Sequence, residues 1–470
     1  MTAPAVRVEE IRLYERDIAF RMPFRFGVVT LTACPQAMVR VRIAGDGGEA
    51  WGAAAEMLAP KWFDKDLSLS NEDNFRQLRR SIGHAARLYR GGGAASAFDL
   101  YAGSYREQIG ACGADGLNPL IACFGPALLD RAVLDGLCRL HEVSFFEAVR
   151  RNLPGIRAIA LTPDLAGFDL DAFLAGLAPA PYIFARHTVG LVDPIEANPE
   201  PIGDGLPETL AEVVARYGQR YFKLKVGGDE DADLGRLVEI AAVLDRIDGA
   251  YHVTLDGNEQ YADVAGIAAF WQRMRATPAL QRLCGAVLFI EQPIARAQAL
   301  ARDVSALGGE VPVIVDESDA TLDVFPEART LGYRGVSSKS CKGLYRSLLN
   351  RARCGRWNAE AGQDRYFMSA EDLSVQPGLS LQQDLALASL LGLGHVERNG
   401  HHYVDGFAGA PAAEQDAFLA AHPDLYRRDG GKVRLRIEDG RIALGSLDGP
   451  GFASAAEPAW ASLREMNLPD

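Results

Sequence analysis

The clearest pattern along the chain is a series of short apolar runs in its second half, each ending in polar residues. Eight such runs lie between residues 182 and 400, and segments with helical spacing of apolar residues separate them. The runs are YIFARHTVG, RYFKLKVGG, YHVTLDGN, AVLFIEQP, VPVIVDES, YRGVSSKS, RYFMSAED and LGHVERNG. Eight strands alternating with helices predict an α/β fold built on a (β/α)8 TIM-type barrel.

The first part of the chain has a different rhythm. Residues 6–20 and 37–52 alternate apolar and polar positions, as half-buried strands do, and we expect a loop over 21–35 between them. Residues 69–90 begin with a helix-capping signal and continue at helical spacing, and residues 126–153 predict one long amphipathic helix. Strands followed by helices predict an α+β unit here.

The length of the chain agrees with more than one domain. A chain of 470 residues exceeds the size at which single hydrophobic cores usually stop growing. We predict an N-terminal α+β capping domain over residues 1–155 and the barrel over 156–431. Residues 432–470 again have a strand–turn–strand pattern and are predicted to return to the capping domain.

Composition narrows the classes of function. A net charge of −13 argues against binding to a nucleic-acid backbone, although local cations can still bind a small anion. The seven cysteines are scattered without a C-x-x-C pair, so neither a zinc ribbon nor a disulfide framework is indicated. The sequence has no run of 18 apolar residues and opens without the apolar stretch of a signal peptide. We therefore expect a cytoplasmic protein with no membrane partner.

Residues of suitable chemistry follow five consecutive predicted strands. The order is Lys225, Asp256, Glu291, Asp316 and Lys339, separated by 31, 35, 25 and 23 residues, each about one βα unit. Active sites of such barrels lie at the carboxyl ends of the strands. A single acidic residue there is usually a turn former or a helix cap, and a lone lysine pair is usually a solvated strand edge. Five suitable residues in succession instead favour a site.

The residue types suit a hard cation and a lysine base. Three converging carboxylates without cysteine or histidine fit Mg²⁺, which stabilises the charge formed when a carboxylate substrate loses its α-proton. Lys223 and Lys225 lie two apart on one strand and face the same side. A neighbouring ammonium and a bound cation both lower the pKa of a lysine, whereas arginine does not deprotonate in proteins.

These motifs together resemble the enolase superfamily, and specifically its mandelate racemase/muconate lactonizing enzyme family. FKLKVGG resembles the K-x-K strand of that family, LDGNEQY, IEQP and VDES its three metal-ligand strands, and SSKSCKG its sixth-strand lysine. ALLDRAVLDGL, GGEAWGAAAE and DGRIALGSLDGPGF resemble its capping-domain helix, its hairpin and its C-terminal return strand. Lysines on both faces resemble the muconate-lactonizing-like subgroup. One departure is that Lys342 and a single Gly343 stand where the family often has two glycines.

The resemblance implies a role for each matching residue. Asp256, Glu291 and Asp316 would bind one Mg²⁺ per active site, Lys225 would be the base with Lys223 lowering its pKa, and Lys339 would act on the opposite face. The implied reaction removes the α-proton of a small carboxylate through an enediolate, most simply as a racemase, epimerase or cycloisomerase. A homo-oligomer is also expected. The side chains predicted to bind substrate are Asn258, Glu317, Glu371, Arg25, Trp62 and His401.

Two alternatives stay open. An acid-sugar dehydratase of the same superfamily would use the histidines after the eighth strand to expel hydroxide, although histidines without a role in that loop are the simpler interpretation. A barrel that binds a ligand without catalysis is the second alternative. Glu371 and its neighbour Asp372 could bind substrate or cap the next helix, and the sequence does not decide between these.

Overall fold

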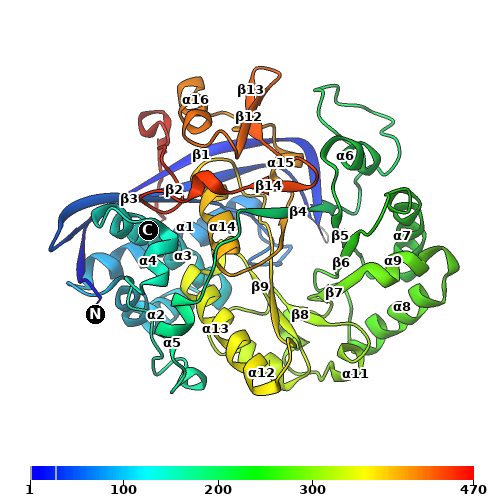
Figure 1. Ribbon diagram of the computed structural model, residues 1–470, viewed down its shortest axis with the longest axis horizontal. Helices are drawn as coiled ribbons and strands as arrows, with labels where there is room; N and C mark the ends of the chain where they lie inside the picture. Colours follow the sequence, from blue (N-terminus) through cyan, green and yellow to red (C-terminus); the bar gives the residue numbers. More distant parts are fainter. Residues whose placement is uncertain (1–2, 27–28, 470) are drawn as a thin grey trace.

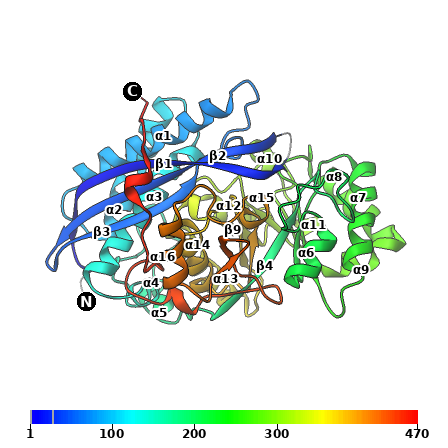
Figure 2. The same cartoon turned by 90° about the horizontal axis from the view of Figure 1, so that it is seen from above.

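The computed structural model describes residues 3–26 and 29–469, in which a β-rich N-terminal part packs beside and over a barrel (Figure 1). Figure 2 shows the blue N-terminal strands crossing above one end of the barrel. Both parts share one continuous hydrophobic core. The predicted fold class is therefore confirmed.

The barrel contains eight parallel strands, and all eight predicted runs form them. The strands follow one another around the sheet in chain order, and the last pairs with the first, which closes the barrel. They are β4 (Tyr182–Val189), β5 (Tyr221–Lys225), β6 (His252–Asp256), β7 (Val287–Glu291), β8 (Val313–Val315), β9 (Gly335–Ser338), β10 (Phe367–Ala370) and β11 (His395–Arg398).

Helices connect these strands on the outside of the barrel, as parallel pairing requires. They are α6 (Leu210–Tyr217), α7 (Glu230–Leu244), α8 (Val264–Ala276), α9 (Gln281–Ala286), α10 (Arg296–Ala299), α11 (Ser305–Gly308), α12 (Val324–Thr330), α13 (Leu344–Ala361) and α14 (Leu379–Leu390). α15 (Gly400–Tyr403) and α16 (Ala412–Ala421) follow the last barrel strand.

The N-terminal part is an antiparallel sheet covered by helices. The sheet contains β1 (Val6–Phe26), β2 (Val29–Gly45) and β3 (Gly48–Met57), and the helices are α1 (Asn71–Gly91), α2 (Ala97–Ala114), α3 (Pro119–Leu140), α4 (Phe145–Arg150) and α5 (Leu170–Ala175). α3 packs closely against β3 at Gly52, where a Cβ atom would lie only 2.1 Å from the carbonyl oxygen of Ala132. Ser70 caps α1 as predicted, accepting a hydrogen bond from the Asp73 amide.

Two predictions for this part are wrong. The loop expected over residues 21–35 is largely strand, because β1 and β2 pair through Phe24 and Leu31 into a long hairpin. The single amphipathic helix expected over 126–153 is two helices, since Ser144 caps a new helix by accepting from the Glu147 amide. The first of the two, α3, is buried on nearly all sides, so it is not amphipathic.

The C-terminal segment contacts both parts. β12 (Tyr426–Asp429) and β13 (Lys432–Leu435) pair with each other, and β14 (Arg441–Ala443) pairs with barrel strand β4. The short β15 (Arg464–Glu465) pairs with β1. Among the described residues, no helix is long and apolar enough to cross a membrane.

Candidate active site

The three predicted metal-binding carboxylates lie together at one end of the barrel. Asp256 and Glu291 are the last residues of β6 and β7, and Asp316 directly follows β8. The parallel register aligns Lys225 with Asp256, and Asp256 with Glu291. All three carboxylates are completely buried. The strand-end spacing of the sequence thus becomes a compact cluster in space.

Local hydrogen bonds explain how two of these strand ends are held. After β5 the chain turns through Gly227 and Gly228, whose amides donate to the Asp233 carboxylate at 2.8–2.9 Å. Gly228 has a φ of 84°, a left-handed conformation that favours glycine. After β7, the side-chain oxygen of Gln292 accepts a hydrogen bond from the Asp316 amide at 2.8 Å. Gln292 therefore links the second and third carboxylate strands.

Lys223 holds four carboxylates. Its ammonium lies 2.8–3.0 Å from Asp256, Glu291, Glu371 and Glu397, and the side chain is 1% exposed. Although burial opposes it, these negative charges raise the pKa of Lys223 well above its usual value. Lys223 is therefore an anchor for four acidic groups, in addition to its predicted effect on Lys225.

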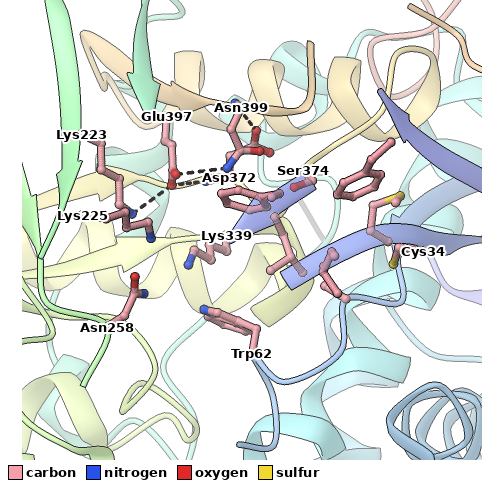
Figure 3. A pocket seen from close by; sticks show the side chains of 16 residues that line it. Cys34, Trp62, Lys223, Lys225, Asn258, Lys339, Asp372, Ser374, Glu397 and Asn399 are labelled. Carbon is pink, nitrogen blue, oxygen red and sulfur yellow. Dashed lines mark hydrogen bonds and ion pairs between the residues drawn. The ribbon is translucent and has the colours of Figure 1, made fainter. Parts of the chain in front are cut away.

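Lys225 and Lys339 approach the cluster from opposite sides of the barrel. β5 and β9 are four positions apart in a closed sheet of eight strands. The Lys225 ammonium lies 2.6 Å from Asp256, and the Lys339 ammonium forms an ion pair with Asp316. Figure 3 shows both lysine side chains ending in the same pocket. The structure thus brings the two predicted proton-transfer lysines face to face.

A further lysine, Lys342, lies behind the cluster. It is 3% exposed, donates to the Ser337 hydroxyl at 2.8 Å and lies 3.3 Å from Asp316 and 3.2 Å from Asp319. From the sequence, Lys342 is only a departure from the pair of glycines that the family often has after its sixth-strand lysine. In the structure it supplies a second positive charge to Asp316.

The carboxylates have opposite electrostatic environments. Burial, together with the nearby charges of Asp256 and Glu371, raises the pKa of Glu291 well above its usual value. Burial acts the same way on Asp316, but the ammonium groups of Lys339 and Lys342 outweigh it and hold the pKa of Asp316 well below its usual value. Of these two carboxylates, only Asp316 has lysine charges that overcome the effect of burial.

The donor chemistry of this cluster fits Mg²⁺. Asp256, Glu291 and Asp316 offer only oxygen ligands, and the Oε2 atom of Glu291 has no hydrogen-bond partner among the described residues. It lies 2.8 Å from the Lys223 ammonium, without hydrogen-bond geometry. Lysines hold the carboxylates, and the described residues contain no group of three or more acidic, histidine or cysteine ligands already arranged around one point. The three carboxylates would hold the ion by exchanging lysine contacts for metal contacts.

A small cavity separates the cluster from the N-terminal hairpin (Figure 3). It encloses about 30 Å³, which is room for roughly two water molecules. The barrel side of the cavity contains the side chains of Lys223, Lys225, Asn258, Lys339, Asp372 and Glu397. The opposite side comes from β1, β2, β3 and the loop after β3. The cavity thus lies between the capping part and the barrel.

The loop after β3 is tied to the barrel by charged groups. The Lys65 ammonium lies 2.5 Å from Glu259 and donates to the Asn258 carbonyl at 2.8 Å. Arg296 pairs with Glu259 at 2.8 Å and donates to the carbonyl oxygens of Trp62 and Phe63, both at 2.9 Å. Glu259 therefore forms ion pairs with Lys65, which belongs to the loop, and with Arg296, which binds the loop backbone at Trp62.

The substrate-binding predictions have mixed outcomes. Asn258 and Trp62 line the cavity. Glu317 is buried beneath Asn258, whose amide donates to it at 3.2 Å, and Glu371 is buried behind Lys223, where Arg186 pairs with it. Neither carboxylate lines the cavity.

Arg25 and His401, also predicted to bind substrate, lie outside the lining of this cavity. Arg25 is exposed because it alternates with the buried Phe24 on β1, so the two side chains point to opposite faces of the strand. His401 packs edge-on against Tyr217, with ring centroids 5.5 Å apart, and is not part of the cavity lining.

His187, His401 and His402 lie together beside the site, and His187 and His402 are buried whereas His401 is half-buried. The rings of His187 and His402 lie 4.8 Å apart in an edge-to-face contact. Burial lowers the pKa of His187 and the pKa of His401 to about 3, so both are neutral at neutral pH. A neutral, enclosed histidine is poorly suited to protonate a leaving hydroxyl group.

Sequence reasoning missed two polar side chains at the end of the last strand, Glu397 and Asn399, and left the role of Asp372 open. Glu397, Asp372 and Asn399 line the cavity, and Glu397 also accepts a hydrogen bond from Thr188 at 2.6 Å. Glu397 lies in the run LGHVERNG, so the strand-end rule applied to the other strands would have found it.

Backbone conformations around the rim are unusual. Five residues other than glycine near the site have positive φ angles between 33° and 68°, which occur rarely outside glycine. They are Lys61, Asn258, Glu259, Gln292 and Ser374. Such conformations cluster at functional sites, where the surrounding structure holds them.

Comparisons with known proteins agree with this fold. Residues 206–340 match the family described as enolase C-terminal domain-like. This stretch includes β5 to β9, with Lys223, Lys225, Lys339 and the three metal-ligand candidates. No curated protein sequence matches the chain.

Solved structures match over nearly the whole length. The muconate lactonizing enzyme from Mycobacterium smegmatis complexed with muconolactone is 18% identical, with a TM-score of 0.59, and the match covers 98% of this chain and 100% of that one. The 2-chloromuconate cycloisomerase from Rhodococcus opacus 1CP is 16% identical, with a TM-score of 0.58 and coverage of 96% and 97%. The L-Ala-D/L-Glu epimerase from Bacillus subtilis is 15% identical, with a TM-score of 0.56 and coverage of 96% and 99%.

At these identities the likeness establishes the fold alone, a capped (β/α)8 barrel like that of these enzymes. The family match to residues 206–340 supports the same assignment from sequence. The resemblance to the enolase superfamily is confirmed, and the muconate-lactonizing-like subgroup stays a prediction.

Proposed function

We propose that this chain, an enolase-superfamily fold with an enolase C-terminal domain-like barrel, is a Mg²⁺-dependent enzyme that removes the proton next to a substrate carboxylate. Racemisation, epimerisation or cycloisomerisation is the outcome we favour. The observation that carries the proposal is the approach of Lys225 and Lys339 to one cavity from opposite sides, with three buried carboxylates between their strands.

The position of each residue in the site indicates its role in the proposed reaction. Asp256, Glu291 and Asp316 would hold Mg²⁺, which supplies positive charge at the substrate carboxylate when bound. Lys225 would take the α-proton from one face of the substrate, and Lys339 would deliver or take a proton on the other face. Lys223 keeps four carboxylates in place around them.

Transfer between two faces explains why lysine is needed at both positions. A base must be neutral for part of the cycle, and arginine keeps its charge in proteins. A residue on each side of the substrate allows a proton to leave from one face and return on the other. This arrangement favours racemisation or epimerisation when the substrate α-carbon is a stereocentre.

The dehydratase alternative has less support. His401 and His402 are outside the cavity lining, and burial keeps the pKa of each well below neutral pH. The non-catalytic alternative also has less support, because it gives no reason for two buried lysines to end in the same cavity.

Hydrogen exchange tests the proposal. Candidate carboxylates are incubated with the protein in D₂O, with Mg²⁺ or with excess chelator, and loss of the α-proton signal is followed by NMR. We expect exchange of the α-proton that depends on Mg²⁺. Absence of α-deuterium across a broad panel, with the metal present and the protein folded, would contradict the proposal.

A further inference from the structure

The cavity has two chemically different sides. The barrel side contains the lysines and carboxylates described above, whereas the capping side is apolar. Six large apolar side chains face it, five from the capping part and one from the loop after β10. They are Phe20, Phe24, Leu31, Met57, Trp62 and Leu373. A substrate whose carboxylate reaches the barrel side must place the rest of its body against these groups.

One polar atom on the capping side has no partner. The indole Nε1 of Trp62 is buried and lacks a hydrogen-bond acceptor among the described residues, and the whole side chain is only 3% exposed. Figure 3 shows this nitrogen on the end of the ring that faces Lys225 and Asn258. Because a buried donor without an acceptor is unfavourable, a ligand oxygen at this position would satisfy it.

The indole is held in place by its surroundings. The Lys339 ammonium lies 4.3 Å from the ring centroid, and the Phe63 ring packs edge-on at 4.8 Å. Arg296 binds the Trp62 carbonyl oxygen from the barrel. The position of the Nε1 donor relative to Lys339 is therefore defined before a ligand enters.

The apolar side also disfavours two kinds of carboxylate. A polyhydroxy acid would bury several hydroxyl groups there, and each hydroxyl without a partner costs roughly tenfold or more in affinity. A second carboxylate would need a cation, yet none of the residues that the structure places around the cavity is an arginine. The lysines that line the cavity lie on its barrel side, where the first carboxylate is proposed to bind.

We infer that the substrate is a monocarboxylic acid with an apolar body, aryl or branched alkyl, and one hydrogen-bond acceptor placed to receive the Trp62 Nε1–H. The inference rests on the proposed function for where the carboxylate lies. The apolar body then lies against the capping side chains that line the cavity. Trp62 then selects among apolar acids by its single donor.

Calorimetry with four probes tests this inference in the presence of Mg²⁺. 4-Phenylbutanoate has an apolar body, and 4-oxo-4-phenylbutanoate adds one carbonyl acceptor to the same skeleton. Gluconate is a polyhydroxy acid, and adipate has a second carboxylate. We expect both aryl acids to bind at least tenfold more tightly than gluconate or adipate. The oxo acid should bind about threefold to tenfold more tightly than 4-phenylbutanoate, as one net hydrogen bond allows.

A pair of tryptophan variants isolates the indole donor. Trp62→Phe keeps an aromatic ring and removes the N–H, so it should abolish the preference for the oxo acid while retaining the preference for aryl acids. Trp271→Phe is the matched control, because Trp271 is also buried with an unpartnered Nε1 but lies on α8, outside the cavity lining. That variant should retain both preferences.

The outcomes separate this inference from the proposed function. Tightest binding of gluconate or adipate overturns the inference, even if these acids exchange their α-protons. Selective binding of aryl acids without any α-deuterium incorporation supports the inference and contradicts the proposed function. An unchanged preference for the oxo acid in Trp62→Phe overturns the role of the indole. No binding of any probe at millimolar concentration overturns the inference as a whole.

Discussion

At the scale of single residues, the site is a balance between buried lysines and buried carboxylates. Lys223 alone forms ion pairs with four acidic groups, and Lys339 and Lys342 both form ion pairs with Asp316. Removing one partner of such a buried set leaves an uncompensated charge. Each of these side chains therefore has a structural role as well as the chemical role that we propose for it.

Replacement of one carboxylate should weaken metal binding. Asp256→Asn keeps the shape of the side chain but removes a negative charge from the proposed ligand set. Because loss of even an outer-shell partner commonly costs about 10–100-fold in metal affinity, we expect at least a tenfold loss, measured by titration calorimetry with Mg²⁺. Asp231→Asn is the control, since Asp231 is 88% exposed on α7. Equal affinities in both variants would argue against Asp256 as a ligand.

The histidines beside the site should make stability depend on pH. His401 has a pKa of about 3 in the folded protein, below the value near 6.5 of an unfolded chain. The unfolded state therefore binds a proton first, and the contribution of His401 to stability is lost as the pH falls from about 6.5 towards 3.

The variant His401→Leu removes the imidazole group that binds this proton in the unfolded state. Relative to the parent, its free energy of unfolding should rise as the pH falls below about 6.5, by at most about 1.4 kcal/mol per pH unit for one proton. Urea unfolding at several pH values measures this difference. A difference that is constant from pH 7 to pH 5 would show that His401 is not kept neutral by the fold.

At the scale of elements, the barrel strands were predictable and the capping part was less so. Each barrel strand is a short apolar run bounded by polar residues, and the closed barrel fixes which ends meet. The sequence pattern predicts a loop where β1 and β2 form a long hairpin, because Pro23 interrupts the alternation, although pairing between Phe24 and Leu31 continues the sheet. The break between α3 and α4 depends on the cap at Ser144, which apolar spacing alone does not reveal.

The same contrast holds for the side chains of the site. Lysines and carboxylates at strand ends follow from spacing, because parallel strands end at one edge. The exposed position of Arg25 and the half-buried position of His401 depend on which face of an element meets the core. That choice is made by tertiary packing, which residue types near the site do not specify.

The loop that carries Trp62 should loosen when its tether is removed. Glu259→Gln removes the negative charge that holds both Lys65 and Arg296. We expect backbone amides of residues 59–69 to exchange at least tenfold faster with deuterium, measured by mass spectrometry. Glu230→Gln is the control, because Glu230 pairs with Arg273 on the surface of α7. Unchanged exchange in the loop would show that Glu259 does not restrain it.

At the scale of the whole molecule, a buried polar contact joins the capping part to the barrel beside Lys339. Glu56 on β3 accepts a hydrogen bond from Ser340 at 2.9 Å and pairs with Arg131 on α3 at 3.1 Å. Glu56 and Arg131 are both completely buried. Since Ser340 directly follows Lys339, this contact connects the position of the capping part to that of a proposed catalytic side chain.

Loss of that contact should destabilise the whole fold. Glu56→Ala leaves Arg131 buried without its carboxylate partner, and we expect the free energy of unfolding to fall by about 3–5 kcal/mol in urea titrations. Glu49→Ala on the same strand is the control, because Glu49 is 53% exposed and pairs with Arg42 at the surface. A similar small loss in both variants would mean that the contact contributes little to stability.

The central claim is that one lysine acts on each face of the substrate, and exchange of separate enantiomers in D₂O tests it most directly. Lys225→Arg and Lys339→Arg keep a positive charge at each site but remove a base that can become neutral. The substrate is one whose α-proton the parent protein exchanges with solvent. In each variant we predict that the exchange rate of one enantiomer falls by at least about a hundredfold, whereas the rate for the other enantiomer is largely retained. The two variants should differ in which enantiomer is affected. Loss of the same enantiomer in both variants, or of neither, would contradict the account.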